Sequence, residues 1–145
     1  MEFKKINKID LMVDDFIKNN TNEKFAELIE ELINTNVILI NKELGDNNLK
    51  KLNDDAITPL VITDSLKQNY IPIFSGDHQI INDELKKMKK VNYVFKDLCN
   101  DSIVNNDYIE GYVLNPFTQG LKLPKEVIKI VIKYVNEEQN EKAVS

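Results

Sequence analysis

The sequence contains no arginine and no tryptophan, and it has one cysteine, Cys99, and one histidine, His78. Without arginine, no rigid guanidinium fork is available to hold a carboxylate or phosphate through two parallel hydrogen bonds. A single cysteine cannot form an internal disulfide, and no paired cysteines or histidines are present to begin a zinc site. We therefore expect neither a disulfide framework nor a bound metal.

Glycine and long apolar runs are also scarce. The closest two of the four glycines are Gly111 and Gly120, whereas phosphate loops and dinucleotide folds need clustered glycines so that backbone amides can approach the anion. The longest wholly apolar run, residues 37–40, is far shorter than the roughly 20 residues of a membrane helix. The sequence thus predicts no nucleotide cofactor and no membrane span.

The charge balance is acidic, with 24 Asp and Glu against 19 basic residues and a formal net charge of −5. Nucleic-acid affinity depends on clustered cations that release counterions, so a nucleic-acid partner is not expected. The densest basic stretch, residues 86–90, is interpreted as the solvated end of a helix. No signal-peptide pattern opens the sequence, which favours a cytoplasmic protein.

Hydrophobic spacing predicts two helices near the N-terminus. In residues 1–20, an amphipathic extension, one stripe is formed by Ile9, Met12, Val13, Phe16 and Ile17. A second helix, about 22–34, has its apolar face on Phe25, Leu28, Ile29, Leu32 and Ile33. Because an uncovered apolar stripe is rare on monomers, we expect the extension to dock on its own domain, on a second copy or on a protein partner.

The rest of the chain alternates between strand-like and helical segments. Strands are predicted at about 37–40, 58–63, 70–74, 91–95, 108–114 and 120–123, with helices at about 77–90 and 124–136, a short helical segment after Phe95, and a polar tail at 137–145. Residues 42–56 read as a long loop in which Leu49 and Leu52 pin the chain or form a weak strand. This order predicts a single layered α/β domain, or an α+β one, with a mixed sheet of four to six strands and helices packed on it.

Two features qualify these boundaries. Pro59 and Pro72 lack amide donors, so each is expected at a strand start, an edge or a bulge. In the last helix, Val127, Ile128, Val131 and Val135 are expected to face inward. Its further apolar residues, Ile130, Ile132 and Tyr134, make the run unusually β-branched, and the same run could be read as a strand.

The reactive side chains do not form a recognisable catalytic pattern. Cys99 follows Phe95 and Leu98 on an apolar segment, where a buried, inert thiol is expected. His78 lies at a helix start, which needs no catalytic explanation. The sequential acids Asp14–Asp15 and Asp54–Asp55 diverge on a helix and are interpreted as solvated. We expect no enzyme; the alternative is a small hydrolase using Asp77, His78 or Cys99.

The most informative stretch is Gly111-Tyr112-Val113-Leu114-Asn115-Pro116. It predicts a buried strand that ends in a corner, where the Asn115 side chain bonds backbone amides and Pro116 fixes the exit direction. The alternative is that Asn115 recognises a ligand. The candidate binding residues are then Asn115 with Ser75 and Asp77, the turn and cap that follow an earlier strand.

These motifs carry a resemblance to a known family. Pro72-Ile73-Phe74-Ser75, a helix of the Asp77–Lys90 type, the Gly111–Pro116 strand and Leu121-x-Leu123-Pro124 before a last helix resemble the N-terminal domain of the bacterial SseB proteins. The resemblance covers about residues 21–136. It implies the same fold, a bacterial cytoplasmic protein and a non-enzymatic role, and it supplies no catalytic residues.

The functional prediction is a small binding or regulatory module without chemistry of its own. A small-molecule sensor, for an amino acid or related metabolite, is the main alternative. A sensor needs an apolar cavity with a few convergent polar groups, whereas an interaction module needs an exposed apolar patch.

Overall fold

The computed structural model describes residues 7–41 and 59–144, with side chains described to Gln139. The predicted loop at 42–56, with Leu49, Leu52 and the pair Asp54–Asp55, lies outside these residues. The helices are α1 (Lys8–Lys18), α2 (Asn22–Ile33), η1 (Asp77–Gln79, a 3-10 turn), α3 (Asp83–Lys86), α4 (Phe95–Leu98), α5 (Asp101–Val104) and α6 (Lys125–Val144). The strands are β1 (Asn36–Asn41), β2 (Ile62–Thr63), β3 (Asn69–Phe74), β4 (Lys89–Val94), β5 (Gly111–Leu114) and β6 (Leu121–Pro124).

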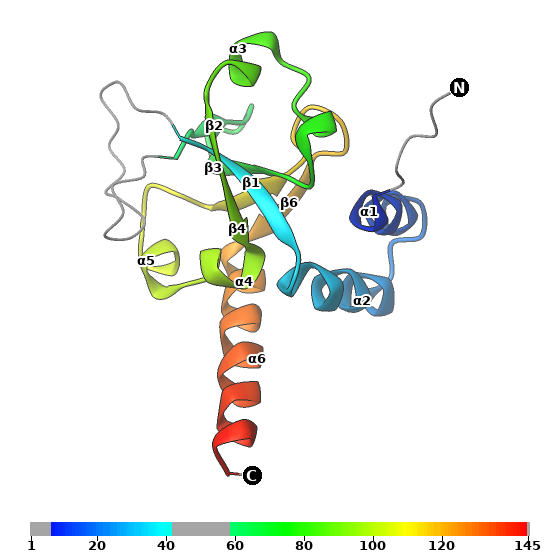
Figure 1. Ribbon diagram of the computed structural model, residues 1–145, viewed down its shortest axis with the longest axis vertical. Coiled ribbons are helices and arrows are strands. Elements are labelled where there is room, and N and C mark those ends of the chain that lie inside the picture. Colours follow the sequence, from blue (N-terminus) through cyan, green and yellow to red (C-terminus); the bar gives the residue numbers. More distant parts are fainter. Residues whose placement is uncertain (1–6, 42–58, 145) are drawn as a thin grey trace.

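The strands form one mixed sheet in the order β4-β1-β3-β5-β6, with β2 paired to β3 (Figure 1). The β3–β5 pair is parallel and the other pairs are antiparallel. Because β3 and β5 run in parallel, their carboxyl ends meet at the same edge of the sheet. The prediction of a single α/β domain with a mixed sheet of up to six strands is confirmed.

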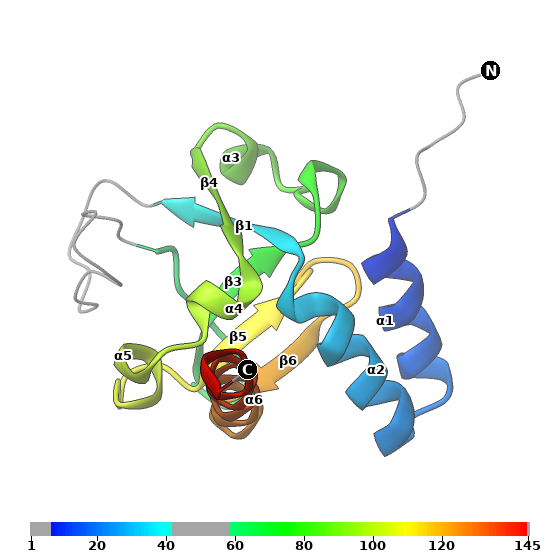
Figure 2. The same ribbon diagram turned by 60° about the horizontal axis from the view of Figure 1, so that its bottom comes forward.

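The two faces of the sheet are covered unequally. Strand side chains that alternate toward one face pack against α1, α2, α4, α5 and α6 in the main core; they are Val37, Leu39, Ile71, Ile73, Tyr112, Leu114 and Leu123. On the opposite face a smaller core joins Ile38, Ile40 and Phe74 to Ile80 and Leu85. In Figure 2, α6 is seen end-on, and α1 lies beside α2 on the side of α6 away from α5.

The predicted helix over 77–90 is wrong. The chain makes only η1 and the four-residue α3, and then enters β4. The side chain of Asn82 accepts hydrogen bonds from the amides of Glu84 and Leu85, which starts a separate short helix. Lys86 and Lys87 form the end of α3, as expected for the lysine stretch, whereas Lys89 and Lys90 belong to β4, opposite Asn41 and Ile40.

The predicted end of the last helix is also corrected. Residues 137–144, expected as a polar tail, continue α6, which projects from the body of the domain in Figure 1. This segment contains Glu, Gln, Lys and Ala, which favour helix, and neither glycine nor proline interrupts it. The β-branched run around Ile130, which could also be read as a strand, is helical in α6.

Pro72 lies inside β3, not at its start. The carbonyls of Asn69 and Ile73 accept hydrogen bonds from Glu110 and Asn115, so the backbone of odd-numbered residues faces β5. The nitrogen of Pro72 therefore faces the other edge of β3. There β2 pairs with residues 69–70 and β1 with residues 73–74, and the proline occupies the change of partner, where a missing amide donor is tolerated.

The N-terminal extension docks on its own domain. The side chain of Asn7 caps α1 by accepting from the Asp10 amide at 3.2 Å, and Thr21 caps α2 in the same way. Ile9 and Val13 are buried in the main core, while Ile17 stays exposed. Of the three surfaces on which the extension was expected to dock, the structure shows the first, its own domain.

Candidate functional site

Two regions combine unusual features: a polar corner at the carboxyl ends of β3 and β5, and an apolar groove between α2 and α6. At the corner, the predicted residues Ser75 and Asn115 each follow the last residue of a strand and meet. The Ser75 amide donates to Asn115 Oδ1 at 3.0 Å, and Asn115 Nδ2 donates to Ser75 Oγ at 3.1 Å. The third predicted residue, Asp77, is exposed in η1 and takes no part in these hydrogen bonds.

Asn115 is fully buried and has φ of 51°, a left-handed conformation that asparagine tolerates better than most residues. The turn after it is held by its main-chain carbonyl, which accepts from the amides of Gln119 at 3.0 Å and Gly120 at 2.8 Å. As the sequence predicts, the Asn115 side chain bonds a backbone amide, but this amide is that of Ser75 and not one within the turn after Asn115. The side chain therefore joins the two strand ends. Asn115 thus fixes the position of Ser75.

The acceptor at the centre of the corner is Asp10 of α1. Its Oδ1 accepts from the Ser75 hydroxyl and, at 3.3 Å, from Asn115 Nδ2, while its Oδ2 lies 2.5 Å from His78 Nε2. Burial opposes ionisation of Asp10, but hydrogen bonds from His78 and Ser75 hold the pKa of this carboxyl below its usual value. Asp10 is therefore a carboxylate at neutral pH.

A polar row on α1 faces this corner. Asn7, Asp10 and Asp14 are spaced i, i+3 and i+7, which places them on one side of the helix. Asn7 Nδ2 donates to the Ser75 carbonyl at 3.2 Å, and Gln119 Nε2 donates to the Asp10 carbonyl at 2.9 Å and to Asp14 Oδ1 at 2.7 Å.

Sequence reasoning missed Asp10 and Gln119 and interpreted Asp14 and Asp15 as solvated. Asp14 accepts from Gln119, and Asp15 lies 2.5 Å from the Lys24 ammonium. The spacing of the polar row was the available signal, because it gives α1 a second, polar face beside its apolar stripe.

The corner does not have the arrangement of a serine hydrolase. In a catalytic triad the imidazole lies between the serine and the carboxylate, where it can accept the hydroxyl proton. Here the Asp10 carboxylate lies between Ser75 and His78. Cys99, another proposed nucleophile, is buried in the main core, and burial raises its pKa to about 12, which keeps it a thiol.

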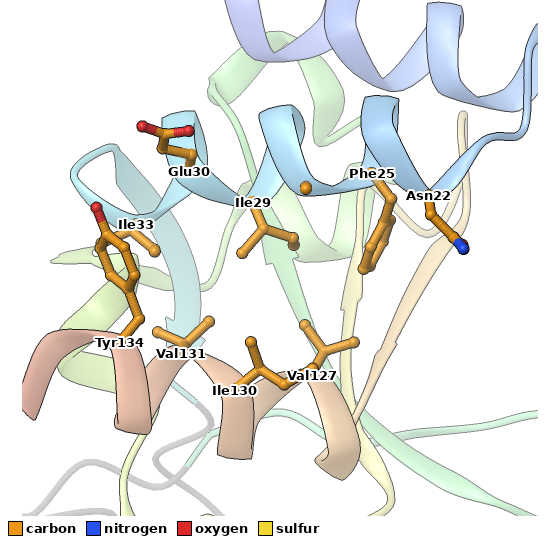
Figure 3. A pocket seen from close by; sticks show the side chains of 10 residues that line it. Asn22, Phe25, Ile29, Glu30, Ile33, Val127, Ile130, Val131 and Tyr134 are labelled. Atoms are coloured by element: carbon orange, nitrogen blue, oxygen red, sulfur yellow. The ribbon is translucent and has the colours of Figure 1, made fainter. Parts of the chain in front are cut away.

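The second region is an apolar groove of about 390 Å³ between α2 and α6. Figure 3 shows side chains of the two helices pointing toward one another across it. Its lining is Asn22, Phe25, Ala26, Ile29, Glu30 and Ile33 from α2, and Val127, Ile130, Val131 and Tyr134 from α6. Ile130 is 62% exposed and Tyr134 45% exposed, so the groove opens to solvent along α6.

The rim of the groove is mainly acidic. Glu30 belongs to the lining, and Glu23 lies one turn from Ala26 on the exposed side of α2. On α6, helical spacing places Glu126 and Glu137 on the same side as Ile130, with Lys133 as the opposing charge.

Within residues 7–41 and 59–144, no group of three or more His, Cys, Asp and Glu is placed to hold a metal ion. No helix of that part of the chain combines the length and apolarity needed to cross a membrane. No family model, curated protein or solved structure matches this chain. The resemblance to the SseB N-terminal domain therefore remains a prediction that depends on its motifs alone.

Proposed function

We propose that the protein is a binding module that accepts an amphipathic helix of a partner protein in the groove between α2 and α6. The observation that carries this proposal is the exposure of Ile130 and Tyr134 beside an apolar groove. Helix-in-groove recognition uses such a channel, into which apolar side chains at i, i+3, i+4 and i+7 insert.

The composition of the groove favours a helix over a small metabolite. A sensor for an amino acid needs partners for both an ammonium and a carboxylate, but the polar groups of the lining belong to Asn22, Glu30 and the Tyr134 hydroxyl. Among the residues that the structure describes, no cationic side chain lines the groove to hold a carboxylate. The remaining lining residues are apolar and suit an extended apolar face.

The charge around the groove indicates a basic partner. Glu30 in the lining, with Glu126 and Glu137 on the α6 side, would repel an acidic helix and attract lysine or arginine beside an apolar face. Two copies docked groove to groove would place these carboxylates opposite one another. A second copy of the chain is therefore the less favoured occupant.

The wider proposal follows from the sequence: a non-enzymatic regulatory module of a bacterial cytoplasm, resembling the SseB N-terminal domain. The inverted order of Ser75, Asp10 and His78 and the protonated, buried Cys99 support a role without catalysis.

A synthetic helix of about four turns, with leucines on one face and lysines on the other, tests the groove. We expect it to bind the full chain in fluorescence anisotropy, and a glutamate version of the same peptide to bind more weakly. Full burial of an isoleucine contributes roughly 1.5 to 3 kcal/mol, and Ile130 is 62% exposed. Its burial against the peptide should therefore contribute about 1 to 2 kcal/mol, and Ile130→Glu should weaken binding by about fivefold to 30-fold.

Leu66→Glu is the matched control, because Leu66 is 74% exposed but lies outside the groove lining. It should leave the affinity unchanged. Equal loss in both variants, or equal binding of the lysine and glutamate peptides, would contradict the proposal. A concentration-dependent dimer in sedimentation that Ile130→Glu abolishes would identify a second copy as the occupant instead.

A further inference from the structure

We propose that the corner formed by Ser75, His78 and Asn115 is a carboxylate-binding site, that Asp10 fills it as a built-in ligand, and that a small-molecule carboxylate competes with Asp10 for it. This site is separate from the groove, and the proposal does not depend on the groove's occupant.

The donors of the corner contact both oxygens of one carboxyl group. Ser75 Oγ and Asn115 Nδ2 donate to Asp10 Oδ1, and His78 Nε2 lies 2.5 Å from Oδ2. Asn115 is itself held from behind, because its Oδ1 accepts from the Ser75 amide and its Nδ2 also donates to Gln119. The donors are therefore fixed in position by the ends of β3 and β5.

The donor set suits a carboxylate better than a phosphate. A carboxylate is planar, carries one negative charge and offers two acceptor oxygens, which three donors can satisfy. A phosphate has more oxygens and a larger charge, and it is usually held by arginine or lysine. The donors at this corner are a hydroxyl, an amide and an imidazole.

Gly76 makes room for the imidazole. A Cβ atom at Gly76 would lie 2.7 Å from both Cε1 and Nδ1 of the His78 ring. The glycine thus permits the ring to fold back toward Asp10. His78 is also the outermost donor, with its side chain 53% exposed against 17% for Asp10, so it marks the side from which a free carboxylate would enter.

The position of α1 allows Asp10 to leave. The helix precedes α2 and joins the described body of the domain through the short link of residues 19–21. Its contacts with the corner are hydrogen bonds of the Asn7, Asp10 and Asp14 side chains and one from Gln119 to the main-chain carbonyl of Asp10. Of the α1 residues, Ile9 and Val13 are buried in the core, and Met12 and Phe16 pack against it partly buried. Displacement of Asp10 would release one polar face of α1 without breaking the sheet.

Asp10→Ala empties the site and permits chemical rescue by acetate. Thermal unfolding is compared in sodium acetate and in sodium chloride at equal concentration and neutral pH. We expect acetate to raise the Tm of Asp10→Ala saturably, by at least about 2 °C more than chloride does. Adding Ser75→Ala should remove this gain. If Asp10→Ala is unfolded in chloride, acetate should restore cooperative unfolding.

Asp15→Ala is the matched control, because it removes a carboxylate from the same helix at an exposed pair with Lys24. It should show no difference between the two salts. No acetate effect on Asp10→Ala, or an equal effect on Asp15→Ala, would overturn the binding site. For competition, amide hydrogen exchange of residues 10–18 in the wild-type chain should accelerate with acetate but not with chloride. Unchanged exchange at an acetate concentration that saturates Asp10→Ala would overturn the displacement of Asp10.

Discussion

Replacement of Asn115 tests how the two parallel strand ends are held together. In Asn115→Ala, the Ser75 amide loses its acceptor, and Asp10 and Gln119 each lose a donor. Loss of these hydrogen bonds, with the partly buried Ser75 amide left unpaired, costs about 2 to 3 kcal/mol. Alanine also tolerates φ of 51° poorly, which adds roughly 1 kcal/mol. The expected destabilisation is therefore about 3 to 4 kcal/mol.

Asn115→Gly separates the two contributions. Glycine accepts the left-handed conformation but lacks the side chain, so this variant should be more stable than Asn115→Ala by up to about 1 kcal/mol. Urea denaturation followed by circular dichroism gives both free energies of unfolding. Equal stability of the two variants would refute the conformational argument. A glycine variant within about 0.5 kcal/mol of the wild type would refute the hydrogen-bond argument.

Three further predictions concern Cys99, Asp10 and Phe16. Cys99, with its pKa raised to about 12 by burial, should react with a thiol reagent at pH 8 only as fast as the chain unfolds, and a rapid reaction in the native state would contradict its burial. Because the folded pKa of Asp10 is lowered, its ionised form stabilises the fold above a pH of about 4, and this effect is lost as the pH falls through the folded pKa. The difference in unfolding free energy between wild type and Asp10→Asn should therefore shrink over that acid range. A difference that stays constant would be inconsistent with the contacts of Asp10. Phe16 packs on the groove residue Phe25 with ring centroids 5.1 Å apart, so Phe16→Ala should weaken peptide binding to the groove, whereas Leu11→Ala, at an exposed position of α1, should not.

The sequence predicted elements whose signal is local. The apolar stripe of α2 and the short β-branched run of β1 fixed those elements, because periodicity and length suffice to identify them. The helix predicted over residues 77–90 was wrong because the apolar spacing of Ile81, Leu85 and Met88 is typical of a helix. The cap at Asn82 and the pairing of β4 with β1 override that spacing.

The candidate sites were harder to predict because they depend on contacts between distant residues. Ser75 and Asn115 could be singled out, since each follows a predicted strand, but only the parallel pairing of β3 and β5 brings them together. Asp10 lies far from both in the chain, and no local pattern connects them. The groove likewise needs the relative placement of α2 and α6, although the excess of apolar residues in α6 was visible from the sequence.

The most direct test of the proposed function is to locate the binding surface by NMR. Amide shifts of the uniformly labelled chain are followed while the leucine–lysine helix is added. The groove predicts the largest changes in residues 22–33 and 127–134, and their loss in Ile130→Glu with the rest of the spectrum retained. Changes centred on residues 75–79 and 115–119, or no localised change at saturating peptide, would contradict the assignment of α2 and α6 as the partner-binding surface.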